Sequence, residues 1–394
     1  KLVVIDPRRT ETAAGADLHL AIRADGDTAL FNGLLIDMRR RGLVDQAYLD
    51  AYVDVPDGFW KSLTGGTTGL PEMDVLSFFD LVAAHPKTLT LFSMGVNQSI
   101  GGTDKANAII NFHLATGRIG KLGVGPFSIT GQPNAMGGRE VGGLANTLAA
   151  HLTFSNEDRA IAQAFWNGPG VAPAPGLKAV DLFRAVDDGR IKAIWIMATN
   201  PAVSMPDAGF VRAALAKCPL VIVSDIIADT DTAKLAHIRL PALGWGEKDG
   251  TVTNSERVIS RQRAVFDPPG DARADWAIIA DVARRMGFAQ GFNWRSNADV
   301  FAEFAAMTRF RNDGQRLLSI PEQHDYDSIE PFRWGGSSPF ARGKYSHPGG
   351  RARLIQVLPL FYQRDPSLQF ILNTGRYRDQ WHTMTRTGLS PRLG

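Results

Sequence analysis

Short apolar runs that are typical of buried strands alternate with amphipathic helical runs along most of this 394-residue chain. Strands separated by helices pair in parallel, with the helices packed on both faces of the sheet, so we predict an α/β fold with doubly wound (Rossmann-like) parallel sheets. The expected strands are Leu2–Ile5, Thr88–Phe92, Lys192–Met197, Leu220–Val223, His237–Leu240, Leu354–Val357 and Phe370–Leu372. The expected helices are Asp27–Arg41, Met73–Ala84, Thr103–Leu114, Ala179–Val186, Asp207–Ala216, Ala272–Met286 and Ala298–Thr308.

Glycine- and proline-rich stretches interrupt this alternation. Gly117–Gly143 combines many glycines with hydrophobic residues and little charge, so we expect an ordered loop that packs against a surface. Asn167–Gly176 is more typical of a surface linker, and Arg311–His347 is expected to be irregular.

The composition limits what kind of protein this is. Lys and Arg number 43 against 40 Asp and Glu, and a net charge of +3 gives no reason to expect a nucleic-acid partner. The single cysteine, Cys218, excludes an internal disulfide, a multi-cysteine zinc site and a cysteine-bound iron–sulfur cluster within these residues. No apolar run is long enough to cross a bilayer, so we expect no membrane partner. Because the sequence opens at Lys1 inside an expected strand, we interpret it as an internal fragment of a larger protein.

Polar side chains follow directly after most of the expected strands. Asp6, Asn97, Asn200, Asp225 and Asn373 occupy such positions. Turns favour Asp and Asn in any case, and this explains each position taken singly. Ligands of open α/β sheets bind outside the carboxyl ends of the strands, so the repeated pattern favours a large polar ligand. Carboxylates and amides suit ribose hydroxyls and purine edges, whereas helix N-termini, Arg and Lys suit pyrophosphate.

The common nucleotide and catalytic fingerprints are missing. No Gly-x-Gly-x-x-Gly run follows a strand, and no loop ends in Gly-Lys-Ser/Thr, so a dinucleotide would not be held in the NAD manner. The histidines lack metal-ligand spacing, and His113 is expected to be structural. Ser128 and Ser204 lack a nucleophile-elbow context, and Cys218 is expected to be a buried, inert thiol.

Several motifs resemble the molybdopterin oxidoreductases, above all the long run Thr130–Gly143. The others are Gly95–Gln98, Asn111–Gly117, Ile5–Ala16, Val223–Asp231, Gly246–Arg257 and Leu372–Gly388. The resemblance covers the whole chain and is strongest toward assimilatory nitrate reductases. It implies the formate dehydrogenase/DMSO reductase fold, with residues 1–143 and 144–365 as two partial α/β cofactor-binding domains and 366–394 as the beginning of a C-terminal β-barrel.

The resemblance also implies a molybdenum ion held by two molybdopterin guanine dinucleotides. One guanosine end would contact Asp6, Pro7, Arg8, Arg9, Thr10, Asp25, Gly26 and Asp27. The other nucleotide would contact Asn200, Ser224, Asp225, Lys248 and Asp275. Met94 and Gln98 would lie along a pterin, and Gly95, Asn97, Gln132 and Pro133 are further binding candidates. Thr374, Gly375, Arg376, Trp381, His382 and Thr383 would close over the cofactor.

The implied reaction is the reduction of nitrate to nitrite by oxygen-atom transfer at molybdenum. Nitrate is a small, weakly basic anion, and its reduction needs a nearby cation to position it and balance charge. By resemblance Arg139 is the catalytic candidate, with Gln132 and Met94 shaping the pocket. The alternative for Arg139 is a structural contact with Glu140 or a backbone carbonyl.

The chain departs from the family in what it lacks. The cysteines of the family's [4Fe-4S] cluster and the cysteine that ligates molybdenum are absent, and Leu122 stands where relatives often carry proline. We therefore expect the fragment to be inactive alone, to derive from a cytoplasmic enzyme with a separate electron-donor protein or domain, and to self-associate through an incomplete sheet. Two alternatives stay open. One is another molybdenum enzyme such as a formate dehydrogenase, and the other is a non-catalytic nucleotide-binding or interaction module.

Overall fold

The computed structural model describes residues 1–129, 132–168, 170–322, 325–341, 343–347, 349–363, 365–370, 379–380 and 382–393. These residues form a mixed α/β fold, and the predicted parallel sheets are present. Parallel pairing joins β1 (Val3–Ile5) to β2 (Leu18–Leu20), β4 (Leu89–Phe92) to β5 (Gly125–Ser128), and β6 (Ala193–Met197) to β7 (Leu220–Asp225) and then β8 (Ile238–Pro241).

The N-terminal unit is built around β1, β2, β4 and β5. Its helices are α1 (Glu11–Ala14), α2 (Asp27–Arg40), α3 (Gln46–Tyr52), α4 (Phe59–Ser62), α5 (Glu72–Ala84), α6 (Met94–Asn97) and α7 (Gly102–Ala115). Helices α2 and α7 pack together because each has an apolar face at helical spacing, which includes Leu30, Leu34, Ile109 and Phe112. Burying these side chains is the main stabilisation of the framework from which the loops after the strands extend.

The β6–β8 unit covers its sheet with α10 (Ala179–Asp187), α11 (Pro201–Ser204) and α12 (Ala208–Lys217). Helix α12 begins where predicted because the Asp207 carboxylate accepts a hydrogen bond from the Phe210 N–H at 3.2 Å. Cys218 is buried in this core, as expected for an inert thiol.

A third packed region contains an antiparallel sheet that the sequence did not predict. Strands β9 (Gly250–Thr253) and β10 (Val258–Gln262) form a hairpin, and β10 also pairs with β11 (Phe332–Arg333). Only a short loop separates β9 from β10, so these strands can pair only antiparallel. Around the hairpin lie α8 (Ala135–Glu140), α9 (Asn156–Trp166), α14 (Asn297–Arg309) and the 3₁₀ turns η1 (Ala149–His151) and η3 (Trp245–Glu247). Helix α13 (Asp275–Arg285) begins just after Arg273, which bridges to Ala242 directly after the end of β8. The other 3₁₀ turns are η2 (Ala233–Leu235) and η4 (Thr387–Leu389).

One expected strand is wrong. Leu354–Val357 has no ladder partner, whereas the preceding β12 (Ala352–Arg353) pairs in parallel with β3 (Val53–Asp54). Leu354 and Val357 are instead buried in the N-terminal unit, although they fall within the expected second domain. The expected strand Phe370–Leu372 lies largely outside the described residues, and Phe370 itself is exposed and not in a strand.

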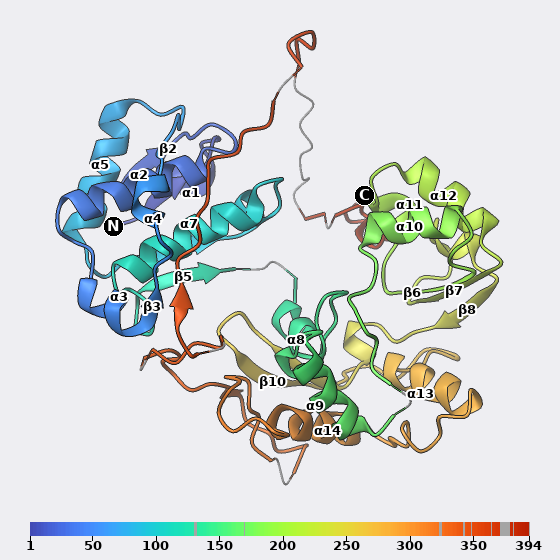
Figure 1. Cartoon of the computed structure of the whole chain (residues 1–394). Coiled ribbons are helices and arrows are strands. Elements are labelled where there is room, and N and C mark those ends of the chain that lie inside the picture. The colour runs from blue at the N-terminus through green and yellow to red at the C-terminus, as the bar shows by residue number, and fades with distance from the viewer. Residues whose placement is uncertain are drawn as a thin grey trace.

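The strand ends of the two α/β units face the middle of the molecule. In Figure 1 the carboxyl end of β5 and the arrowhead of β8 both point there from opposite sides. The orange C-terminal segment runs back across the N-terminal unit beside β5 (Figure 1). Among the described residues, no helix is long and apolar enough to cross a membrane.

Candidate functional site

A cavity of about 910 Å³ lies in the N-terminal unit, where β1 and β4 end. Its walls include part of the first expected nucleotide set, namely Asp6, Pro7, Asp25 and Asp27, together with Gly95. Asp6 and Gly95 line the same cavity because β1 and β4 both end beside it. Concave sites of this volume typically hold nucleotide-sized ligands.

A buried lysine that the sequence analysis missed lies on the same cavity. The Lys105 side chain is only 4% exposed, and its Nζ lies 2.9 Å from the Asp25 carboxylate and 3.1 Å from that of Asp27. Burial by itself would lower the pKa of Lys105 and raise that of Asp25. Their hydrogen bond and opposite charges outweigh burial, so the pKa of Lys105 is raised and that of Asp25 is lowered.

The backbone around these two aspartates is fixed by its local sequence. Asp25 adopts a left-handed conformation with φ of 66°, which Asp tolerates better than most residues. Gly26 is buried, and a Cβ there would lie 2.8 Å from Ile22 Cγ1, so only glycine fits. Asp27 lies in the first turn of α2, where its negative charge interacts favourably with the helix dipole.

The other residues of the first expected set have local roles or lie in solvent. The Asp6 carboxylate accepts a hydrogen bond from the Arg8 N–H at 2.7 Å. Thr10 caps α1 by accepting from the Ala13 N–H at 3.3 Å. The side chains of Arg8 and Arg9 are exposed. The turn therefore presents two cations beside the cavity carboxylates.

The second expected set meets the C-terminal segment at the end of the β6–β8 sheet. Asn200 is buried, and its Oδ1 accepts from the Thr232 N–H at 3.2 Å and hydroxyl at 2.7 Å, while its Nδ2 donates to Thr385 Oγ1 at 3.0 Å. The Asp225 carboxylate lies 3.2 Å from Arg386 Nη2 and accepts from the Ile226 N–H at 2.7 Å. The sequence analysis missed Thr232, Thr385 and Arg386.

The remaining members of this set make separate contacts. Ser224 is fully buried and accepts from the Trp195 indole N–H at 2.8 Å. Lys248 Nζ and the Asp275 carboxylate form an ion pair at 2.5 Å, about one third exposed on each side. These residues do not line the cavity that contains Asp6 and Asp25.

The expected closing segment is only partly described. Thr374, Gly375, Arg376 and Trp381 lie outside the described residues. His382 Nε2 lies 3.2 Å from Gln132 Nε2, and Thr383 Oγ1 lies 2.8 Å from Thr385 Oγ1. The segment thus contacts both the β6–β8 unit and the residues that follow β5.

The residues that are expected to contact a pterin are exposed to solvent. Met94 in α6 is 44% exposed, and Gly95, Asn97, Gln98 and Pro133 are exposed as well. They follow the neighbouring parallel strands β4 and β5, so they lie at one edge of that sheet. Their side chains are available to a ligand there.

Arg139 and Glu140 point into different surroundings. Glu140 is 1% exposed and accepts from Thr253 Oγ1 at 2.8 Å and from the Trp334 indole N–H at 2.6 Å. Burial raises the pKa of this carboxyl. The Arg139 side chain is exposed and makes no hydrogen bond or ion pair with the described residues, although its carbonyl accepts from the Gly142 N–H at 3.2 Å. The structural contact with Glu140 that the sequence left open is therefore not made.

The comparisons with known proteins cover nearly the whole chain. The family described as "Molybdopterin oxidoreductase" matches residues 1–285. "Nitrate reductase" of Klebsiella oxytoca is 49% identical over 100% of this chain and 47% of its own length, and "Nitrate reductase" of Shewanella frigidimarina is 45% identical over 98% and 44%. The fold is similar to that of acetylene hydratase from Pelobacter acetylenicus, with a TM-score of 0.66 at 18% identity, over 93% of this chain and 54% of that one. The chain spans about half the length of the relatives it matches.

Proposed function

This chain belongs to the molybdopterin oxidoreductase family, and we propose that the whole protein reduces nitrate to nitrite at a molybdenum centre. The observation that carries this proposal is the 49% identity to a nitrate reductase across all of the chain. We propose that these residues form the region that holds the two nucleotide ends of a molybdenum–bis(molybdopterin guanine dinucleotide) cofactor. The domain bounds 1–143, 144–365 and 366–394 are part of the proposal.

The residues present fit such a cofactor in their chemistry. Guanine offers N–H donors, which carboxylates such as Asp6 and Asp25 accept. The cavity that these two residues line measures about 910 Å³, and Lys105 holds the carboxylates of Asp25 and Asp27 in position at its wall. Near the second set, Trp276 Nε1 and Thr387 Oγ1 are buried without a hydrogen-bond partner among the described residues. Buried polar atoms of this kind are normally satisfied, so they favour a further polar group at this position.

The second nucleotide end is proposed to lie against Asn200, Ser224, Asp225, Lys248 and Asp275. Asp225 and Asn200 are held in place by Arg386 and Thr232, so their polar atoms are pre-organised for a ligand. Residues 374–383 are proposed to close over the cofactor, and the contact between Gln132 and His382 supports such a closure.

The bound cofactor would supply the redox centre that accepts an oxygen atom from nitrate. Arg139 is the group of this chain that we propose to position the anion, because its guanidinium is exposed and free of acidic partners among the described residues. A guanidinium donates two parallel hydrogen bonds, a geometry suited to two oxygens of a planar oxyanion. Gln132 and Met94 are proposed to shape the pocket around it.

Electrons are proposed to arrive through a [4Fe-4S] cluster carried by another part of the same protein, from a separate donor protein or domain in the cytoplasm. Cys218 cannot take part in such a cluster because it is a single, buried thiol.

The test is nitrite formation by the whole, cofactor-loaded protein supplied with a chemical reductant. We expect Arg139→Ala to lower kcat/KM for nitrate by about tenfold or more, equivalent to about 1.4 kcal/mol, with an unchanged molybdenum content. The matched control is Arg295→Ala, because Arg295 is 89% exposed and does not line the N-terminal cavity. Unchanged kinetics in Arg139→Ala would remove this residue from the mechanism. Oxidation of formate without nitrate turnover would instead support the formate dehydrogenase alternative.

A further inference from the structure

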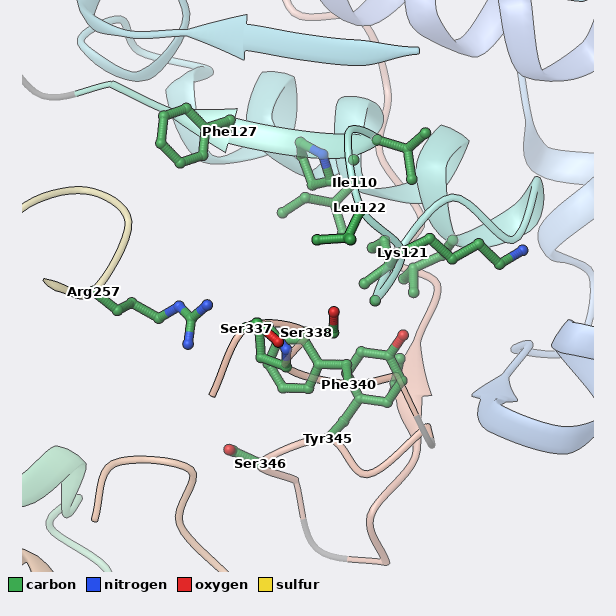
Figure 2. A pocket seen from close by; sticks show the side chains of 18 of the residues that line it. Ile110, Lys121, Leu122, Phe127, Arg257, Ser337, Ser338, Phe340, Tyr345 and Ser346 are labelled. Carbon is green, nitrogen blue, oxygen red and sulfur yellow. The ribbon is translucent and has the colours of Figure 1, made fainter. Parts of the chain in front are cut away.

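A second cavity, of about 650 Å³, lies apart from all the residues assigned above. One wall is the turn Gly120–Gly125 at the start of β5, and the others come from the β9–β10 hairpin loop and from residues 337–340, 345–347 and 351–353. Figure 2 shows this space with Lys121 and Leu122 on one side, Arg257 on another, and Ser337, Ser338 and Phe340 beneath.

The charge of this cavity is strongly one-sided. Among the described residues that line it, and apart from His347, the charged ones are Lys121, Arg257, Arg333, Arg351 and Arg353 against the single acid Glu256. Arg351 is paired with Asp54 at 2.6 Å. In the described part of the chain, Lys121 and Arg353 have no acidic partner. Several cations around one concave space favour a ligand with more than one negative charge.

Arg257 is held in place by backbone carbonyls and by an aromatic ring. It ends the hairpin loop with a φ of 68°, a left-handed conformation that is costly for arginine and that concentrates at ligand-binding sites. Its Nη1 donates to the carbonyls of Trp334 at 2.6 Å and Gly336 at 3.2 Å, and its guanidinium lies 5.3 Å from the Trp334 ring centre. A Cβ on Gly335 would lie 3.1 Å from this Nη1, so glycine leaves room for the arginine.

This arrangement leaves part of the guanidinium free for a ligand. Within the Arg257 guanidinium, only Nη1 has a hydrogen-bond partner among the described residues. Nε and Nη2 are not among the buried polar atoms that lack a partner, so both are accessible. Figure 2 shows the Arg257 side chain extending toward the hydroxyl-bearing Ser337 and Ser338. A fixed guanidinium edge and nearby hydroxyls are the donors that bind tetrahedral oxyanions.

Arg333 reinforces this site. Its Nη2 lies 3.1 Å from the Glu256 carboxylate, and its Nε is buried without a partner among the described residues. Burial lowers the pKa of Arg257, and the neighbouring Arg333 lowers it further. Two arginines held this close repel each other, and an anion between them would remove that repulsion.

We propose that this cavity is a binding site for a doubly charged oxyanion of the phosphate class, separate from the cofactor and from nitrate. In the described part of the chain Lys121, Arg257 and Arg353 form no ion pair, and these three cations set the preference for a dianion over a monoanion. The aromatic rings of Phe340 and Tyr345, which stack with centroids 4.8 Å apart, form an apolar floor beside it. The ligand is therefore either free phosphate or the phosphoryl group of a larger molecule.

Calorimetric titration of the whole, cofactor-loaded protein tests this proposal, with inorganic phosphate, sulfate and nitrate as separate probes. We expect phosphate and sulfate to bind about tenfold or more tightly than nitrate. Arg257→Gln should weaken phosphate binding by about tenfold, and Arg295→Gln should leave it unchanged. Because Arg257 also supports the Trp334 loop, Arg353→Gln serves as a second variant. Arg353 has no acidic partner to lose among the described residues, and its removal should weaken binding without affecting folding.

The arms of the experiment separate the possible sources. Displacement of bound phosphate by a nucleoside monophosphate at lower concentration would identify the phosphoryl group of a larger molecule, whereas phosphate alone would identify the free ion. The proposal is overturned if phosphate fails to bind at millimolar concentration or if nitrate binds equally well. It is also overturned if both arginine variants bind normally, or if binding occurs only in cofactor-free protein, since the cavity would then belong to the cofactor.

Discussion

The replacement Lys105→Met offers the sharpest test of how the N-terminal cavity is held together. Methionine keeps the length and the apolar stem of the lysine but removes the charge that lies 2.9 and 3.1 Å from Asp25 and Asp27. The two carboxylates would then face each other without a cation between them, so the variant should unfold more readily.

The size of the effect follows from burial. Breaking a buried ion pair by removing one partner costs roughly 3–5 kcal/mol when the remaining charge is sealed from water. Because the side chains of Asp25 and Asp27 keep 20% and 17% exposure, water compensates part of that loss. We expect the free energy of unfolding to fall by about 2–4 kcal/mol at neutral pH.

Urea denaturation of the intact protein at several pH values measures this effect. The pKa of Asp25 is lowered in the folded state, so its stabilisation is present above its unfolded value of about 3.9 and is lost as pH falls through the folded value. The pKa of Lys105 is raised, so its stabilisation is present below about 10.4 and is lost as pH rises through the folded value. The difference between wild type and variant should therefore be largest between these limits and shrink below about pH 4.

The exposed pair of Lys217 and Asp187 provides the control, because its side chains are 62% and 30% exposed. Lys217→Met should cost less than about 1 kcal/mol. A loss of that small size for Lys105→Met, or a loss that does not change with pH, would refute the reasoning.

Three further predictions concern other buried polar groups. Burial lowers the pKa of His113 to about 3. As the pH falls from 6.5 to 3, the free energy of unfolding of the wild type should therefore decrease by up to about 1.4 kcal/mol per pH unit. Acid titrations of His113→Gln should lack this slope. Glu140→Ala leaves the Thr253 hydroxyl and the Trp334 indole N–H without an acceptor, and should lower the free energy of unfolding by about 2–4 kcal/mol. Urea denaturation would show this as a lower midpoint concentration, and an unchanged midpoint would contradict it. Asn200→Ala removes the hydrogen bond to Thr385, so trypsin should cleave faster after Arg386. Mass spectrometry of the products measures the cleavage rate. Equal rates in wild type and variant would mean that Asn200 does not hold this segment.

Much of the α/β framework could be predicted because local signals and tertiary packing agree there. The run at 88–92 forms a strand over Leu89–Phe92, and the run at 207–216 forms a helix over Ala208–Lys217 that Asp207 caps. The helix expected from Thr103 instead begins at Gly102 with Gly101 as its N-cap, a shift within the usual uncertainty of helix ends.

The failures have physical causes that a single sequence hides. Helix α9 was not predicted, although Ser155 caps it by accepting from the Asp158 N–H, a signal present in the sequence. The β9–β10 hairpin carries few apolar residues, so its alternation is weak. Leu354–Val357 is apolar because it completes a distant core, and no local pattern distinguishes that role from a buried strand.

Two acidic residues of the N-terminal cavity were expected from the sequence, but its cation was not. Asp6 was expected because it follows a strand, and Asp25 only through the family resemblance. Lys105 lies on α7, and its acidic partners come from before and within α2. The available signal was a lysine on the helix face that also carries Ala108, Ile109 and Phe112. The contacts of Arg386 and Thr385 with the second expected set depend on chain segments far apart in sequence, which no spacing rule reveals.

The pairing of β3 with β12 bears on how the protein is made. Arg351, which directly precedes β12, bonds to Asp54 of β3, and the two residues are separated by 297 positions in the sequence. During synthesis the N-terminal unit emerges from the ribosome long before its last strand and the side chains of Leu354 and Val357 exist. Its partly finished core must therefore remain exposed to proteases and to neighbouring nascent chains until residues 352–357 have been synthesised. A chaperone that shields this edge should increase the yield of folded protein more than faster translation would.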